Sequence, residues 1–411
     1  MNLFRMVATK LIMKHTFIDL FGAPGGMSRG FQLAGFRPLG MLDIFADGVK
    51  TYRKNFPQVP EQNVVLGDAS NLGIVKRFEK TTGLRPGDID VIVGGPPCQG
   101  FSTVGRVMIA QLVKEGVRTG RSKNPRFIDD PRNNLYKSFV KFVRHYRPKA
   151  VVLENVPGMM SYKNGGVADQ IKRDLVASGY PNTDFQILNA VNFGVPQKRK
   201  RIIFIGTRKD TAIQWPEMTH MQLKDDQARL DTQVPVTVRD AFDDLPTLEL
   251  PERGSKAKDE VVAYAKRAIS EYQEFVRDGS TELHNHITRW HRDNDITIFN
   301  FMEEGMRWKD LPDKYRKMIG YSDSSFNDKW KRLVLDEPSW TVVSHLSKDG
   351  YMYIHPTESR TISVREAARL QSFPDSFVFY GSRGSQFKQI GNAVPPLLAM
   401  AIANSVKKML K

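Results

Sequence analysis

The chain is poor in cysteine, because only Cys98 occurs among its 411 residues. A single cysteine excludes a disulfide framework and a metal site built from cysteines alone, and it is typical of proteins of the reducing cytoplasm. The chain also lacks an apolar run of about 18 residues, so no membrane span is predicted. The apolar fraction of 40% and the charged fraction of 26% are those of an ordinary globular protein. We therefore expect a cytoplasmic protein.

Acidic residues are fewer than basic ones. The chain carries 61 Lys and Arg against 45 Asp and Glu, which gives a net charge of +16 at pH 7. An excess of cations favours a polyanionic partner, because binding releases the counterions of that partner. Composition therefore favours nucleic acid as the partner, but it does not identify a site.

The dinucleotide fingerprint G-x-G-x-x-G is absent as well. Instead, an apolar strand predicted at residues 17–21 leads into a turn that contains Gly22, Gly25 and Gly26. Helical spacing follows this turn. Glycines let a backbone approach a ligand closely, and the amino end of a helix attracts negative groups. The pattern predicts a ligand site and disfavours a dehydrogenase.

Strand and helix patterns alternate along roughly the first half of the chain. Further strands are predicted at residues 38–43, 64–68, 89–93, 149–153 and 202–206, and helices at 46–55 and 134–146. This alternation is typical of an α/β fold with a parallel, doubly wound sheet, whose ligands bind at the carboxyl ends of the strands. The predicted strands at 38–43 and 64–68 end on Asp43 and Asp68, and Glu154 directly follows the strand at 149–153. Asp43 and Asp68 could accept hydrogen bonds from a ribose and an adenine amino group.

Cys98 lies in the loop GGPPCQGFS at residues 94–102, directly after the strand predicted at 89–93. A lone cysteine is usually a small buried apolar residue. Two prolines and three glycines around this one indicate a rigid turn, which would bring the sulfur to the carboxyl edge of the sheet. The loop therefore predicts an enzyme. The long basic stretch that follows, residues 103–132, is predicted to be a lid or a loop that contacts phosphates.

The alternation ends near Trp215. From there to about residue 356 the chain is richer in charge, and we interpret it as an inserted second domain. His284, His286 and His291 lie in this region without thiolates or an H-E-x-x-H spacing, so no metal site is predicted. After residue 361 the globular pattern returns, with helices predicted at 362–370 and 397–409.

Six motifs occur in a fixed order: FIDLFGAPGG at 17–26, PPCQ at 96–99, ENV at 154–156, QKRKR at 197–201, REAARLQ at 365–371 and GN at 391–392. As a set they resemble the motifs of the bacterial DNA (cytosine-5) methyltransferase family, over most of the chain outside residues 215–330. The resemblance implies a Rossmann-like methyltransferase domain at 1–214, a smaller inserted target recognition domain at 215–358, and a return segment at 359–411 that completes the catalytic domain.

The resemblance also implies a role for each matching residue. Cys98 would attack carbon 6 of a cytosine flipped out of duplex DNA, and Glu154 would contact the edge of the cytosine ring. Arg199 and Arg201 would position the base and the Cys98 loop. The residues implied to bind S-adenosylmethionine are Phe21, Gly22, Gly25, Gly26, Asp43, Asp68, Pro97 and Asn392. The residues implied to bind DNA are Gln99, Ser102 and Arg106.

Pro24 departs from the family pattern, and a proline offers no backbone N–H to the methionine end of the cofactor. Two other functions remain open. An RNA cytosine methyltransferase on the same scaffold is disfavoured by the long inserted region, and the two-cysteine RNA enzymes are excluded by the single cysteine. A catalytically silent DNA-binding module is disfavoured because Cys98, Glu154, Arg199 and Arg201 are all present.

The resemblance implies further properties of the whole protein. Its substrate would be double-stranded DNA, without a metal, and its context a restriction-modification system or a related defence system. We expect a monomer, since each catalytic domain flips one base, associated with the nucleoid through DNA. The motifs do not encode the target sequence, which depends on side chains of the inserted domain that meet base edges.

Overall fold

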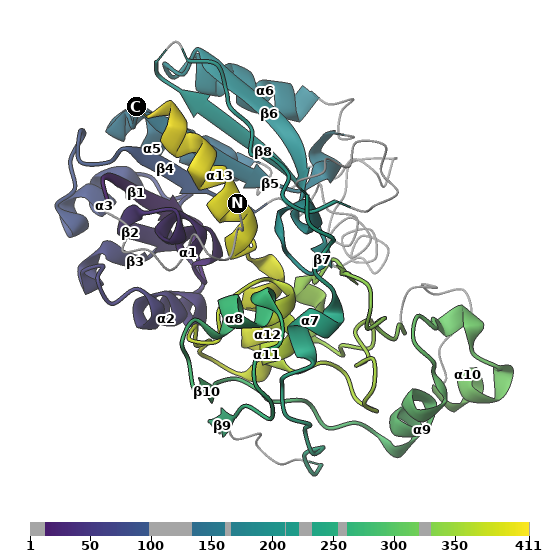
Figure 1. Cartoon of the computed structure of the whole chain (residues 1–411). Coiled ribbons are helices and arrows are strands. Elements are labelled where there is room, and N and C mark those ends of the chain that lie inside the picture. The colour runs from purple at the N-terminus through teal and green to yellow at the C-terminus, as the bar shows by residue number, and fades with distance from the viewer. Residues whose placement is uncertain are drawn as a thin grey trace, which may run out of the picture. The chain divides into compact units, whose positions relative to one another are not determined.

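The computed structural model describes residues 13–97, 134–160, 166–209, 211–221, 232–253, 261–319 and 330–410. These residues divide into two compact units, whose elements are labelled in Figure 1. The sheet unit contains the residues up to Asn189, Lys200–Glu217 and the residues from Leu398 onward. The second unit contains Ala190–Arg199 and Met218–Leu397.

The sheet unit is built on seven strands in the order β3-β2-β1-β4-β5-β8-β6. The strands are β1 (His15–Leu20), β2 (Phe36–Asp43), β3 (Val64–Leu66), β4 (Val91–Gly94), β5 (Ala150–Asn155), β6 (Asn182–Asn189) and β8 (Lys200–Thr207). Strands β1 to β5 pair in parallel, whereas β8 is antiparallel to both β5 and β6. The predicted α/β, Rossmann-like class is confirmed, and the predicted parallel pairing holds for β1 to β5 but not for β8, which is antiparallel to its neighbours.

The direction of β8 follows from its short connection to β6. Parallel neighbours need a crossover of a dozen or more residues, usually a helix. Only Ala190–Arg199 separates β6 from β8, and this segment holds the short elements η5 (Ala190–Phe193) and β7 (Gln197–Lys198). The sequence did not predict β6, because this edge strand exposes several residues and lacks a clean apolar alternation.

The helices of the sheet unit cover an apolar core. They are α1 (Gly26–Leu33), α2 (Ala46–Asn55), η2 (Glu61–Asn63), α3 (Ile74–Thr82), α5 (Leu135–Tyr146), α6 (Gly166–Val176) and the greater part of α13 (Pro396–Met409). In α5, Tyr136, Phe139, Val140 and Val143 recur at three- and four-residue spacing and are buried, as an amphipathic helix requires. The last helix packs near α1, since Lys407 Nζ donates a hydrogen bond to Ala34 O at 2.9 Å.

The second unit is made of short elements. Its strands are β7, β9 (Val262–Ala263), β10 (Glu282–Leu283) and β11 (Ser339–Trp340), which pair as β10-β9 and β11-β7. Besides η5, its helices are α7 (Val238–Phe242), α8 (Glu271–Arg277), α9 (Asp293–Phe301), η6 (Trp308–Asp310), α10 (Asp313–Ile319), η7 (Ser344–Ser347), α11 (Val364–Leu370) and α12 (Arg383–Asn392). Figure 1 shows α9 and α10 in a lobe apart from α7, α8, α11 and α12. Stacking of Trp330 on Tyr351, with ring centroids 4.3 Å apart, belongs to the small aromatic core of this lobe.

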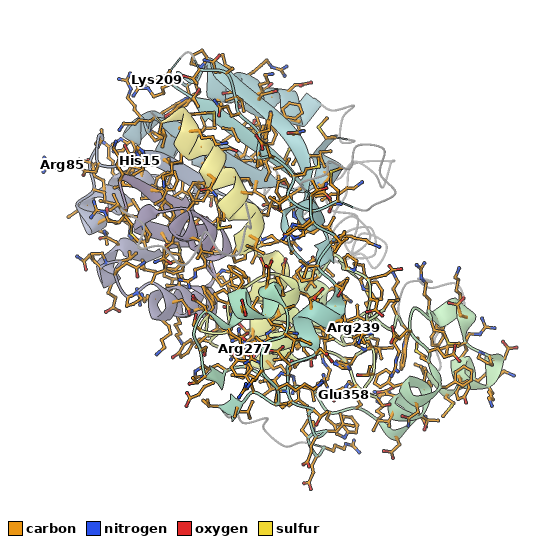
Figure 2. The ribbon with its side chains drawn as sticks, in the orientation of Figure 1. His15, Arg85, Lys209, Arg239, Arg277 and Glu358 are labelled. Atoms are coloured by element: carbon orange, nitrogen blue, oxygen red, sulfur yellow. The ribbon has the colours of Figure 1, made fainter. Side chains whose placement is uncertain are left out.

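Buried ion pairs hold the rest of the second unit together. Arg369 of α11 is fully buried and pairs with Asp375 at 2.6 Å and with Asp244 at 2.5 Å. Asp244 also accepts a hydrogen bond from Arg277, which Figure 2 labels. Burial alone would raise the pKa of Asp375, but the guanidinium of Arg369 holds it below the ordinary value. The REAARLQ motif thus forms a helix whose two arginines, Arg365 and Arg369, both lie inside the unit.

Two further findings limit what the described residues can do. None of their helices has the length and apolar character needed to cross a membrane. Within the same ranges, no group of three His, Cys, Asp or Glu side chains could hold a metal ion. Two of the three histidines named in the sequence have structural contacts: His286 lies against Ser363 Oγ at 3.0 Å, and His291 Nε2 accepts from the Thr361 N–H. The predicted domain boundaries, after residues 214 and 358, stay predictions.

Candidate active site

The Gly-rich turn between β1 and α1 has room only for glycine at two positions. A Cβ atom added to Gly22 would lie 2.5 Å from Asp19 Cγ, and one added to Gly25 would lie 2.5 Å from Phe56 Cε2. Gly25 also has a φ of +116°, which L side chains rarely adopt. Phe21 carries a positive φ of 59°, so the backbone turns sharply directly after the strand. These close contacts and positive φ angles fix the shape of the turn in front of α1.

A buried polar cluster, Asp19, Ser28 and Tyr52, lies beneath this turn. Ser28 Oγ donates to Asp19 Oδ2 at 2.7 Å and shares a hydrogen bond with the Tyr52 hydroxyl at 3.0 Å. Burial raises the pKa of Asp19 to about 7, and the nearby charge of Asp43 acts in the same direction. The sequence patterns did not predict this cluster. The signal that could have revealed it is the acidic Asp19 within the otherwise apolar strand FIDLF.

The strand-end carboxylates lie where the sequence predicted them. Because β3, β2 and β1 are adjacent and parallel, Asp43 and Asp68 follow neighbouring strands at one edge of the sheet. Asp43 accepts hydrogen bonds from the Ala23 N–H at 3.1 Å and the Phe45 N–H at 2.8 Å. It therefore joins the Gly-rich turn to the start of α2. Asp68 accepts from the backbone and hydroxyl of Ser70, which orders its own turn.

Glu154 and Arg201 form an ion pair that the register of the sheet explains. Glu154 of β5 lies opposite Ile203 of β8. Arg201 precedes Ile203 by two residues, so its side chain is on the same face of the sheet and diagonal to Glu154. Arg201 Nε lies 2.8 Å from Glu154 Oε1. Burial lowers the pKa of Arg201, and the carboxylate of Glu154 opposes that shift.

This ion pair lies against the start of the loop that contains Cys98. A Cβ atom added to Gly95 would lie 3.0 Å from Glu154 Oε2, so the glycine leaves room for the carboxylate. Asn155 Nδ2 donates to Pro96 O at 3.2 Å and fixes the same stretch from β5. The end of β5 is therefore in direct contact with the segment three residues before Cys98. Pro97 is the last described residue of this loop, and it is exposed.

Arg199 lies in the second unit and has different partners. It is 1% exposed, and its guanidinium donates to the backbone oxygens of Val342, Gly391 and Ala393 at 2.7 to 3.2 Å. Asn392, which lies between the last two, ends α12 and has an exposed side chain. The two arginines of the QKRKR motif thus enter separate networks.

Comparison with known proteins identifies the family. The sequence model for C-5 cytosine-specific DNA methylases matches residues 15–408. The chain belongs to this family. The type II methyltransferase M.AgeI of Thalassovita gelatinovora is similar to it, with 34% identity over 95% of this chain and 98% of that protein. The type II methyltransferase M1.HphI of Haemophilus parahaemolyticus is also 34% identical, over 97% of this chain and 88% of that protein.

A solved structure agrees with this membership. The crystal structure of an E. coli protein described as a DNA modification methyltransferase encoded within a prophage superposes with a TM-score of 0.67 and 26% identity. The superposition covers 97% of this DNA methylase and 99% of that chain. The predicted family, fold class and DNA (cytosine-5) methyltransferase function are therefore confirmed.

The roles of individual residues in this DNA methylase stay predictions. The structure brings Glu154, Arg201 and the Gly95-Pro96 segment together, and it places Asp43 on the Gly-rich turn. The loop predicted at residues 103–132 lies outside the described residues. So do four predicted site residues: Cys98, Gln99, Ser102 and Arg106.

Proposed function

We propose that this chain methylates carbon 5 of a cytosine in double-stranded DNA, with S-adenosylmethionine as the methyl donor and Cys98 as the nucleophile. The observation that carries the proposal is the position of the Glu154 carboxylate, which pairs with Arg201 and lies beside Gly95, three residues before Cys98. A carboxylate and a cation beside a cysteine loop match the needs of cytosine activation. Membership of the DNA methylase family supports the same reaction.

The Gly-rich turn fits the cofactor. Side chains at Gly22 and Gly25 would clash with Asp19 and Phe56, so the turn keeps its shape only with glycine at both positions. Phe21 and Gly26 complete the turn, and the carboxylates of the next two strands serve the ribose and the adenine. The full proposed set is Phe21, Gly22, Gly25, Gly26, Asp43, Asp68, Pro97 and Asn392. When bound, S-adenosylmethionine supplies an electrophilic methyl group.

The chain's own residues make carbon 5 reactive. The Cys98 thiolate adds to carbon 6 of the cytosine, which breaks the conjugation of the ring and moves electron density onto carbon 5. Glu154 contacts the ring nitrogen and the exocyclic amine as that charge develops. Arg201 orients Glu154 through the 2.8 Å ion pair. Once carbon 5 is methylated, loss of its proton returns electrons to the ring, and the bond from carbon 6 to Cys98 breaks.

The two faces of the cytosine must be open to sulfur and to the methyl donor, which a stacked duplex does not allow. The base is therefore flipped into the site, at an unstacking cost of a few kcal/mol. Gln99, Ser102 and Arg106 contact the DNA that the base has left. The type II methyltransferases among the relatives suggest a restriction-modification context for this chain. We propose further that the protein is a monomer in the cytoplasm and associates with the nucleoid through DNA.

A covalent trap tests the function. With S-adenosylmethionine, duplex DNA containing 5-fluorocytosine at the target should form an adduct that survives denaturing electrophoresis, because fluorine at carbon 5 cannot leave as a proton does. Genome-wide mapping of 5-methylcytosine in cells that express the chain supplies the target sequence for that duplex. Cys98→Ser should abolish the adduct and leave DNA binding largely intact. An RNA of the same sequence serves as the comparison substrate. The proposal fails if the wild-type protein binds cofactor and target DNA but forms no adduct.

A further inference from the structure

Arg199 caps the carboxyl end of α12. The last four carbonyl groups of a helix have no partner inside the helix, and they carry partial negative charge. Arg199 donates to Gly391 O at 3.2 Å and to Ala393 O at 2.9 Å, one on each side of Asn392. A third hydrogen bond, to Val342 O at 2.7 Å, anchors the guanidinium to the segment that follows β11. The cation therefore supplies donors to this helix end.

Two glutamines brace the cap. Gln371 Nε2 donates to Ile390 O at 2.6 Å and to Ala393 O at 3.3 Å. Gln197 Nε2 donates to Gln371 Oε1 at 3.0 Å, and Gln197 Oε1 accepts from the Val342 N–H at 2.7 Å. Arg199, Gln197 and Gln371 are each at most 1% exposed. All three side chains are needed to hold this geometry. Arg199 and Gln371 donate to the carbonyl groups at the helix end, and Gln197 holds Gln371 in place.

Close packing against η7 restricts the end of α12 further. A Cβ atom on Gly391 would overlap the backbone nitrogen of Ser344, so α12 touches the η7 backbone at this point. The side chain of Asn392, in contrast, is exposed. A rigid backbone that presents one exposed amide side chain is the arrangement expected of a binding residue whose support lies behind it.

We propose that Arg199 is a positioning residue for Asn392, one of the residues proposed to bind S-adenosylmethionine, and that it does not contact the cytosine. This inference rests on the proposed function, which gives Asn392 its ligand. The donors of Arg199 are directed at backbone carbonyls, whereas Arg201, two residues later, pairs with Glu154. Arg199, the first arginine of the QKRKR motif, then supports cofactor binding. Arg201, the second, orients Glu154 toward the cytosine.

Substitutions of the two arginines should change different steady-state constants. Arg199→Lys keeps the charge but replaces a planar guanidinium with a single ammonium, which cannot reach three carbonyls in fixed directions. We expect Arg199→Lys to raise KM for S-adenosylmethionine about tenfold, which corresponds to the loss of a hydrogen bond or two, and to keep kcat within about threefold of wild type. The matched variant Arg201→Lys should lower kcat at saturating S-adenosylmethionine and leave cofactor affinity near the wild-type value.

A double-mutant cycle tests whether Arg199 acts through Asn392. Binding of S-adenosylhomocysteine is measured by titration calorimetry for wild type, Arg199→Lys, Asn392→Ala and the double variant, after circular dichroism has shown that each is folded. If Arg199 acts through Asn392, the double variant should bind no more weakly than Asn392→Ala. Two independent, additive losses, or an Arg199→Lys variant with unchanged affinity and reduced kcat, would overturn the inference.

A second variant covers the case in which Arg199→Lys does not fold. Gln371→Met removes the neighbouring donor to Ile390 O and Ala393 O and leaves Arg199 in place. Gln371→Met should weaken S-adenosylhomocysteine binding about threefold when Asn392 is present. In the Asn392→Ala variant, the same substitution should have no effect. Equal losses in both backgrounds would contradict the inference. A wild-type chain that binds no S-adenosylhomocysteine would instead refute the proposed function.

Discussion

The two units of the molecule differ in where they bury charged side chains. In the sheet unit, Asp19 is buried against the hydroxyl of Ser28, and the Glu154–Arg201 pair lies at the edge where chemistry is proposed. In the second unit, ion pairs form part of the interior: Arg369 lies between Asp244 and Asp375, and Arg360 pairs with Glu366 at 2.7 Å. Glu358, labelled in Figure 2, adds a second carboxylate to Arg360.

The difference follows from how each unit is built. A seven-stranded sheet satisfies its backbone groups through ladders and offers long apolar faces to helices. The second unit has strands of only two residues and short helices, so many backbone carbonyls need other donors. Arginine side chains supply them. Arg365, for example, donates to the carbonyls of His284, Pro374 and Phe377.

The largest effect should come from removing the central cation of the second unit. Arg369→Met leaves Asp244 and Asp375 buried with one cation fewer, which is expected to destabilise the fold by about 3–5 kcal/mol. Urea unfolding followed by tryptophan emission measures it, because Trp290, Trp308, Trp330 and Trp340 all belong to the second unit. Arg277→Met serves as the control, since Arg277 is partly exposed and Arg369 would still pair with Asp244. Equal losses in the two variants would contradict an interior held by Arg369.

The sequence predicted the sheet unit far better than the second unit. The helix expected at 46–55 has those bounds in the structure, and Asp43 and Glu154 do end or nearly end buried strands. Apolar periodicity carries this information, because both faces of the sheet are covered. Periodicity does not carry strand direction, so the strand at 202–206 was predicted but its antiparallel direction was not.

Long-range polar contacts escaped prediction altogether. Arg369 and Asp244 are 125 residues apart in the chain, and Arg199 and Gly391 are 192 apart. No local pattern links such pairs. The motif QKRKR predicted two functional cations but could not reveal that the chain passes from one unit to the other between them. Asp19 was missed for a related reason: its partner Ser28 lies across the Gly-rich turn.

The buried acid of the sheet unit should make stability depend on pH. The pKa of Asp19 is raised to about 7 by burial, against an ordinary 3.8. Between these values the folded protein holds a proton that the unfolded chain releases, so stability falls as pH rises, by about 1 kcal/mol per pH unit. Asp19→Asn should remove this fall between pH 5 and pH 7 in urea unfolding experiments. Ser28→Ala, which removes the hydrogen bond that favours the carboxylate, should extend the fall to higher pH. An unchanged slope in Asp19→Asn would rule out Asp19 as its origin.

The smallest effect on stability is expected at an ion pair that has good geometry but lies exposed at the surface. Arg239, labelled in Figure 2, forms two hydrogen bonds with Asp336, at 2.5 and 2.9 Å, and both side chains are largely exposed. Water and salt screen such a pair, and its side chains lose entropy when they are fixed. Arg239→Met should therefore leave the urea midpoint within experimental scatter, in the same tryptophan assay that reports the loss for Arg369→Met. Because the two substitutions remove the same chemical group, the difference between them measures what burial adds. A shift for Arg239→Met as large as that for Arg369→Met would mean that charge alone, and not its burial, holds the second unit together.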